Sequence, residues 1–215
     1  IFSSNLLLFF IIFIFIIIFV IQLIYFKSRF RIQKYLLIKK SNNLEKGYNY
    51  FVNAMIALAN KDKKTAVQSH YKMEKLLGND QSLSLLLRSE IFKIEKKYDQ
   101  LQLVHQEMIS NKSTQTLGYK GLMEQNLNSQ DYHHAFIYGE KLFDLNPYIE
   151  KLYPTLVSII AKSKNWNQLI LVSKKAHIKK IISIIDFNKN TSIAYYEISK
   201  IKMYSDPKES LKLIQ

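Results

Sequence analysis

Residues 119–147 read YKGLMEQNLNSQDYHHAFIYGEKLFDLNP, and this stretch decides the fold. Apolar residues recur at helical spacing on both sides of a polar break at Asn128 to Asp131, and Asn146 and Pro147 end the second segment. The pattern predicts two short amphipathic helices joined by a tight turn. One such pair cannot bury its apolar stripes alone, so we expect similar pairs to stack along the chain.

The same unit recurs along the chain with a period close to 34 residues. One residue at an equivalent place in each second helix, which we call the anchor residue, repeats at steps of 35, 34 and 34: Ala66, Leu101, Ala135 and Leu169. Twelve residues after each of the first three anchors stands a turn-forming residue, at Gly78, Ser113 and Pro147. A helix-turn-helix unit of 34 residues is typical of tetratricopeptide repeats. The sequence therefore predicts an all-α fold with an α-solenoid.

The repeats divide the chain into segments. Residues 44–185 hold four tetratricopeptide-like hairpins. After Ile185 the period slips, and we interpret the polar stretch Asp186 to Ser192 as an insertion. Two further helical segments, at 194–203 and 206–214, then complete residues 186–215 as a truncated fifth repeat.

The N-terminal segment has a different character from the repeats. From Leu6 to Phe26 every residue except Gln22 is apolar or aromatic, which in a helix spans about 30 Å, the thickness of a bilayer core. A signal peptide has a shorter apolar run with positive charge before it. We therefore predict a transmembrane helix within residues 1–26, with a short non-cytoplasmic start. Since the first residue is Ile rather than Met, we also expect upstream residues.

A basic segment at residues 27–43 comes after the apolar run. Its six basic side chains, which we call the basic collar, are Lys27, Arg29, Arg31, Lys34, Lys39 and Lys40. The positive-inside rule places the chain after Phe26 on the cytoplasmic side, and the collar is expected to bind anionic membrane lipid. We expect an amphipathic helix over Phe30 to Lys40, broken at Ser41 to Asn43.

The net charge of +14 is concentrated at two places. Besides the collar, residues 160–202 contain nine lysines and two carboxylates, a net charge of +7. This section has no arginine, the residue best suited to bidentate phosphate and base contacts. We therefore expect no nucleic-acid partner. A solvated face, an acidic protein partner and the membrane surface are the remaining interpretations of this charge.

The sequence offers little for catalysis or cofactor binding. It contains no cysteine, no P-loop and no G-x-S-x-G elbow, and its five histidines lack metal-binding spacing. Gly118 and Gly121 fall inside a predicted helix, so we interpret them as packing residues. His70 and His105 each lie four residues after an anchor, and packing is the expected role of both. We expect no enzyme activity, no metal and no cofactor.

Protein partners are expected on the first helices of the repeats. In a tetratricopeptide stack these helices line a surface on which peptides and partner helices dock. The repeat register places five charged residues there, which we call the first-helix strip: Glu90, Lys93, Lys120, Glu124 and Lys162.

Several of these segments resemble one protein family. Gly47 to Asp62 looks like the start of the first repeat in the HemY family of membrane-anchored tetratricopeptide proteins of proteobacteria. Leu117 to Leu122 (LGYKGL) is similar to that family's Leu-Gly-Leu-Arg-Gly-Leu motif, and Trp166 occupies the family's tryptophan position. Asn165 departs from the family's turn aspartate. The resemblance implies an inner-membrane protein with a cytoplasmic helical domain and a link to haem biosynthesis.

These observations predict a membrane-tethered scaffold for protein–protein interaction at the cytoplasmic face of a bacterial inner membrane. A mitochondrial inner membrane is the alternative location. Two alternative functions stay open: a structural subunit of a larger membrane complex, and a protein that binds a tetrapyrrole through His70 or His105.

Overall fold

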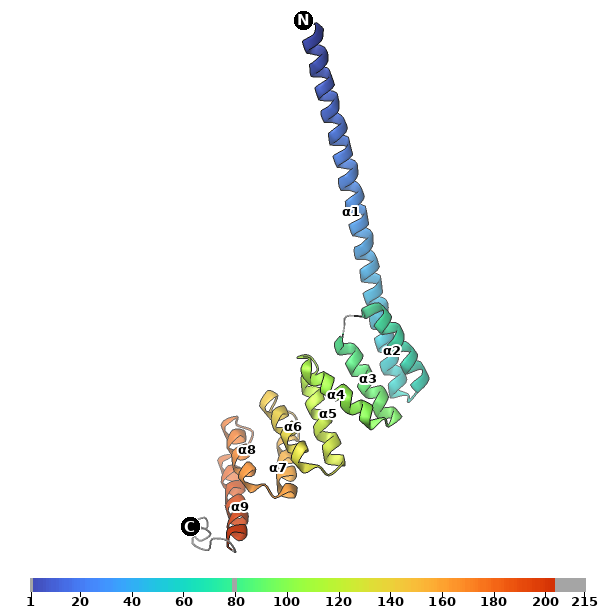
Figure 1. Cartoon of the computed structure of the whole chain (residues 1–215). Coiled ribbons are helices and arrows are strands. Elements are labelled where there is room, and N and C mark those ends of the chain that lie inside the picture. Colours follow the sequence, from blue (N-terminus) through green and yellow to red (C-terminus); the bar gives the residue numbers. More distant parts are fainter. Residues whose placement is uncertain (1, 79–80, 204–215) are drawn as a thin grey trace. The chain divides into compact units, whose positions relative to one another are not determined.

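A computed structural model describes residues 2–78 and 81–203, without the side chains of residues 2–12 and of Phe15. Over the described residues the chain forms nine helices and no strand, which confirms the predicted all-α class (Figure 1). The chain divides into two compact units, Ile1–Asp80 and Gln81–Gln215. We call them unit 1 and unit 2.

Unit 1 contains two helices and unit 2 contains seven. In unit 1 these are α1 (Phe2–Ala59) and α2 (Lys63–Leu77). In unit 2 they are α3 (Gln81–Glu95), α4 (Tyr98–Ser110), α5 (Gln115–Asn128), α6 (Tyr132–Leu145), α7 (Leu152–Ser163), α8 (Trp166–Ile178) and α9 (Ile184–Lys202).

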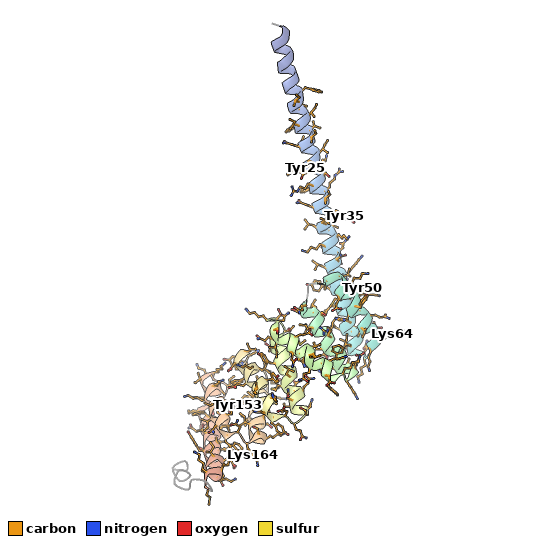
Figure 2. The ribbon with its side chains drawn as sticks, viewed as in Figure 1. Tyr25, Tyr35, Tyr50, Lys64, Tyr153 and Lys164 are labelled. Atoms are coloured by element: carbon orange, nitrogen blue, oxygen red, sulfur yellow. The ribbon has the colours of Figure 1, made fainter. Side chains whose placement is uncertain are left out.

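In unit 1, α2 folds back against the last third of α1. Small residues allow the close approach: Ala54 and Ala66 are fully buried, and a Cβ atom at Gly47 would overlap the Leu77 side chain. Tyr50 lies in this packed part, with the Lys72 ammonium 5.4 Å from the centre of its ring. Figure 2 shows Tyr25 and Tyr35 nearer the N-terminus of α1, where both side chains are exposed.

The predicted break at Ser41 to Asn43 is wrong, because α1 continues through it to Ala59. Neither glycine nor proline occurs there, and Ser and Asn cost a helix only a few tenths of a kcal/mol each relative to Ala. The segment Phe30 to Lys40 is also not amphipathic. At about 100° per residue, its apolar side chains point in all directions around the helix, and the large ones are exposed.

Over the part of the chain that the structure describes, no helix has both the length and the apolar character needed to cross a membrane. The predicted span from Leu6 to Phe26 falls partly outside the described side chains, which begin at Phe13.

Unit 2 consists of consecutive helical hairpins (Figure 1). Its core lies between the helices. The anchors Leu101, Ala135 and Leu169 are all buried, as the repeat pattern predicts. A smaller core cluster joins Leu85 of α3 to Val104 and Met108 of α4. The larger cluster gathers side chains from α5 to α9, including Leu142, Phe143, Leu156, Ile160 and Val172.

The turns within the hairpins repeat as faithfully as the anchors do. Five residues before each anchor stands a residue with left-handed backbone, namely Lys61 (φ 59°), Lys96 (φ 56°), Gln130 (φ 62°) and Lys164 (φ 54°). The next residue donates its N–H to a carbonyl five residues back, as in Asp131 to Asn126 at 2.8 Å. This is the Schellman motif that ends many helices. The repeat is therefore present in the backbone conformation as well as in the side chains.

The polar stretch interpreted as an insertion is helical. Ser183 caps α9 by accepting a hydrogen bond from the Asp186 N–H at 3.1 Å, so the helix begins ten residues before the predicted start at Ala194. α9 has 19 residues and α7 has 12. The seven additional residues match the length of Asp186 to Ser192 and add about two turns, which nearly preserves the orientation of the helix faces. The predicted helix at 206–214 lies outside the described residues.

Candidate partner-binding face

The first-helix strip lies entirely in unit 2. Glu90 and Lys93 belong to α3, Lys120 and Glu124 to α5, and Lys162 to α7. Lys93 Nζ is 3.8 Å from Glu90 Oε1, and Lys120 Nζ is 3.9 Å from Glu124 Oε1. Exposed pairs of this spacing stabilise a helix by only a few tenths of a kcal/mol. A charged partner can therefore replace them at small cost.

Half-buried His105 of α4 packs directly on α5. A Cβ atom at Gly121 would overlap the His105 ring, and one at Gly118 would lie 2.7 Å from the His105 carbonyl oxygen. Both glycines therefore serve close packing, as predicted. His105 Nδ1 is 3.0 Å from Gln125 Oε1, while Gln125 Nε2 donates to the Tyr98 carbonyl at 3.2 Å. This arrangement places the proton on His105 Nδ1.

The charges of the strip act on this same imidazole. Burial lowers the pKa of His105, and it outweighs the opposing hydrogen bond to Gln125 and the nearby carboxylates Glu124 and Glu90. Lys93 adds to the lowering of this pKa. Two helices thus bring three strip residues into electrostatic contact with a neutral histidine.

Lys162 has a different partner from the rest of the strip. Its ammonium lies 5.3 Å from the centre of the Tyr132 ring, at the start of α6. A cation held over an aromatic face is worth about 0.5–1 kcal/mol at an exposed site. Tyr132, three positions before the anchor Ala135, thus orients Lys162 of α7, the first helix of the next hairpin.

His70 belongs to α2 of unit 1, whereas His105 belongs to unit 2. His70 Nε2 is 3.4 Å from Glu74 Oε1, one turn farther along α2. Its side chain is mostly buried, in keeping with the packing role that its position predicts. Among the described residues, no three His, Asp or Glu side chains are grouped so that they could hold a metal ion.

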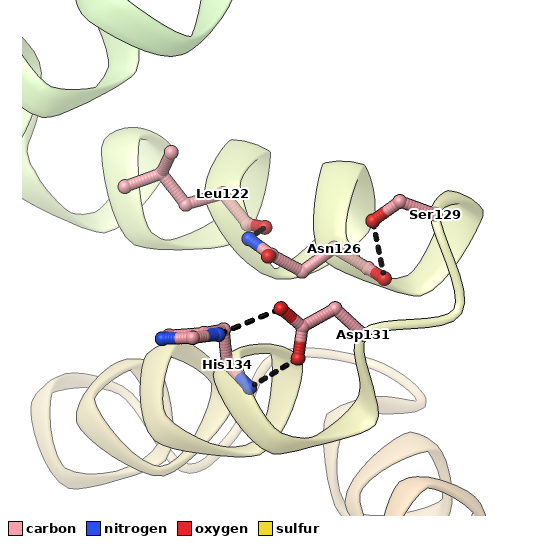
Figure 3. Close-up of polar contacts among 5 residues, drawn as sticks. All are labelled: Leu122, Asn126, Ser129, Asp131 and His134. Atoms are coloured by element: carbon pink, nitrogen blue, oxygen red, sulfur yellow. Dashed lines mark hydrogen bonds and ion pairs between the residues drawn. The ribbon is translucent and has the colours of Figure 1, made fainter.

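The polar residues of the α5–α6 turn serve the helix ends (Figure 3). Asp131 Oδ1 accepts from the His134 N–H at 3.1 Å, and Asp131 Oδ2 is 2.7 Å from His134 Nδ1. The backbone bond, followed by the side-chain bond, lowers the pKa of Asp131. Ser129 Oγ donates to the Asn126 carbonyl at 3.1 Å. These contacts cap α6 and close the turn.

Two polar clusters in unit 2 were not predicted, and the first centres on Tyr153. Its buried hydroxyl lies 3.0 Å from Ser173 Oγ and accepts from Asn190 Nδ2 at 2.7 Å, so it links α7, α8 and α9. Figure 2 labels Tyr153 in this part of the unit. The only signal in the sequence was a tyrosine sixteen residues before three of the four anchors. That position indicated packing and gave no polar partner.

The second cluster centres on Lys175 of α8. Lys175 Nζ donates to Glu140 Oε1 at 2.8 Å and to Asp144 Oδ1 at 3.2 Å, both on α6. Desolvation disfavours the charged amine, but the two carboxylates together outweigh it and raise the pKa of Lys175. The cluster holds successive second helices together, so this lysine is not one of the solvated charges of the section 160–202.

The basic collar lies on α1, and all six of its side chains are exposed. At about 100° per residue, Lys27, Arg31 and Lys34 share one side of the helix. Arg29 and Lys40 lie on the opposite side. The positive charge therefore surrounds α1.

Fold and site together define an all-helical, repeat-like protein with a charged strip on its first helices. No protein-family model matches the chain, and no curated protein is significantly similar to it. The resemblance to the HemY family therefore stays a prediction.

Proposed function

We propose that this chain is a non-enzymatic, membrane-tethered scaffold of tetratricopeptide type. The first-helix strip binds protein partners, and the apolar start of α1 anchors the chain in a bilayer. The observation that carries the proposal is the repeat itself. It buries one anchor per hairpin and leaves the charged residues of the first helices α3, α5 and α7 partly or fully exposed.

The membrane anchor is supported by the exposure of apolar residues on α1. Ile16, Ile17, Phe19 and Phe26 are large apolar residues that stay exposed along the helix. In water, each exposed Å² of apolar surface forgoes about 25 cal/mol, whereas a bilayer covers it. The collar comes directly afterwards, and lysine and arginine near anionic headgroups gain about 1 kcal/mol each. The proposal thus gives α1 a membrane-embedded start and an aqueous end.

A scaffold without catalysis or cofactor is supported by the way the polar side chains are used. His105 Nδ1 is occupied by Gln125, His134 by the cap residue Asp131, and Lys175 by two carboxylates. Each of these contacts stabilises a helix end or a helix pair. A link to haem biosynthesis rests on the HemY resemblance alone, and a bacterial inner membrane, with a mitochondrial one as the alternative, is the proposed location.

The test compares partner capture by two variants of equal charge. In the first, three strip lysines are reversed by Lys93→Glu, Lys120→Glu and Lys162→Glu. In the matched control, three exposed lysines outside the first helices are reversed by Lys112→Glu, Lys141→Glu and Lys174→Glu. Each tagged chain is purified from native membranes in mild detergent, and the proteins that accompany it are quantified by mass spectrometry.

We expect partners that accompany both the wild type and the control variant and are depleted at least tenfold with the strip variant. Equal recovery with all three chains would contradict a role for the strip. Co-migration of the wild type with one stable large assembly would favour the structural-subunit alternative.

A further inference from the structure

The helix ends on either side of the turn between α8 and α9 expose large apolar side chains. Ile178 is 69% exposed, Ile184 is 51% exposed and Ile185 is 75% exposed. Turns that face water are usually built from polar residues and glycine. The corresponding junction between α4 and α5 is polar from the last residue of α4 to the start of α5, with the sequence Ser110 to Thr116 (SNKSTQT).

A second turn extends this apolar surface. Tyr148, in the turn between α6 and α7, is 75% exposed, and its hydroxyl donates to the Lys179 carbonyl at 3.4 Å. The bond places the two turns side by side. We call the surface formed by Tyr148, Ile178, Ile184 and Ile185 the apolar edge of unit 2.

The apolar edge is held in a defined conformation. The Ile181 N–H donates to the Ala176 carbonyl at 2.9 Å, across the left-handed residue Lys180. The His177 ring stacks on Phe187 with centroids 5.5 Å apart, which fixes the end of α8 against the start of α9. The helix ends that carry the three isoleucines are thus joined by a structured turn.

Three lysines lie close in sequence to the isoleucines of the apolar edge. Lys179 and Lys180 lie within the turn, and Lys189 comes one helical turn after Ile185. Two carboxylates are also near in sequence. Asp186 accepts from the Ser183 hydroxyl at 2.7 Å, and Glu150, two residues after Tyr148, lies 3.7 Å from Lys151 Nζ.

Isoleucine and tyrosine bordered by lysine is the combination that suits the interface of an anionic bilayer. Apolar side chains enter the boundary between headgroups and acyl chains, while ammonium groups on long stems meet the lipid phosphates. An acidic protein partner with an apolar patch would also match these residues. The proposed tether favours lipid as the occupant, because it already attaches the chain to a bilayer.

We propose that the apolar edge of unit 2 is a second membrane contact, which docks on an anionic lipid surface. The inference rests on the proposed membrane tether, since the tether attaches the chain to a bilayer.

The absence of cysteine from the sequence allows a direct test. Single cysteines at Ile185→Cys, Ser129→Cys and Leu23→Cys carry an environment-sensitive fluorophore in the full chain. Ser129 lies in the α5–α6 turn and is the exposed control. The chains are reconstituted into vesicles of phosphatidylcholine alone or with phosphatidylglycerol, and lipid-borne quenchers report burial in the bilayer.

We expect at least threefold stronger quenching at position 185 than at position 129 in anionic vesicles, and weaker quenching at 185 in neutral ones. Lys180→Glu with Lys189→Glu should remove this difference while the fluorescence of Trp166 stays unchanged. Equal quenching at positions 185 and 129, with strong quenching at position 23, would contradict the membrane contact of the apolar edge but support the membrane tether. Absence of quenching at 23 would contradict the tether itself.

Discussion

The start of α1 and the core of unit 2 use the same residue types with opposite outcomes. Ile17 and Phe19 of α1 are exposed, whereas Ile160 and Phe143 of unit 2 are fully buried. In unit 2 the buried apolar residues recur at helical spacing, and turns bring the helices that carry them against one another. At the start of α1 the apolar residues follow one another from Leu6 to Phe26, interrupted only by Gln22. Burial is therefore decided by spacing and turns, and hydrophobicity alone does not predict it.

The largest effect expected from this comparison is in the core. Ile160→Ala should lower the free energy of unfolding of unit 2 by about 3 kcal/mol, because it leaves a cavity among buried side chains. Ile17→Ala should change it by less than about 0.5 kcal/mol. Urea unfolding in mild detergent, monitored by the fluorescence of Trp166, measures both. Equal losses would show that the two regions are packed alike.

A smaller loss of unfolding free energy than that of Ile160→Ala is expected where two helices approach most closely. Gly118→Ala should cost about 2 kcal/mol, because the new methyl group would lie 2.7 Å from the His105 carbonyl oxygen and backbone cannot move aside easily. Gly139→Ala is the matched control. Its methyl group would meet Leu156 Cδ2 and Met123 Sδ, which are ends of flexible side chains. The same unfolding measurement applies, and a smaller loss at Gly118 than at Gly139 would contradict the packing described for α4 and α5.

His105 should make the stability of unit 2 depend on pH. Because burial lowers its pKa below the unfolded value near 6.5, the unfolded chain binds more protons, and stability falls as pH drops below about 6.5. The decrease in stability ends once the pH is below the lowered pKa of His105 in the folded state. His105→Gln should flatten this part of the profile, although it lowers stability at neutral pH. Unfolding midpoints between about pH 8 and pH 5 test this expectation, and parallel profiles for the two chains would contradict it.

The smallest expected effect is a gain in the stability of unit 2 from a substitution in the α5–α6 turn. Gln130 adopts φ 62°, a left-handed conformation that costs side-chain-bearing residues about 1 kcal/mol. Gln130→Gly should therefore stabilise unit 2 by about 0.5 kcal/mol, after the larger entropy of glycine in the unfolded chain is subtracted. Ser129→Gly, one residue earlier at φ −82°, should destabilise it. A loss of stability with Gln130→Gly would contradict the Schellman turn.

The repeat could be predicted from the sequence because its signal is periodic. Four anchors at nearly equal steps indicated the positions of the hairpins, and all four are buried. The left-handed turns were not predictable, since lysine and glutamine stand where glycine usually signals them. The continuity of α1 through Ser41 was not predictable either, because residues of low helix propensity are tolerated between strong helical segments.

The surroundings of the strip depend on distances between helices, which the sequence does not contain. The register placed Glu90 and Glu124 on first helices. It gave no sign that both would act on His105, or that Gln125 would hold its ring. Similarly, the sequence does not distinguish Lys175 from the other lysines of residues 160–202. The structure pairs it with Glu140 and Asp144 of α6.

One measurement tests the contrast between the start of α1 and unit 2 most directly. Ile17→Cys and Ser129→Cys are each expressed in a bacterial inner membrane, and inverted vesicles are treated with a membrane-impermeant maleimide. The proposed tether predicts that the cysteine at position 129 reacts at once and that the one at position 17 reacts only after detergent is added. Equal reaction at both positions before detergent would contradict it.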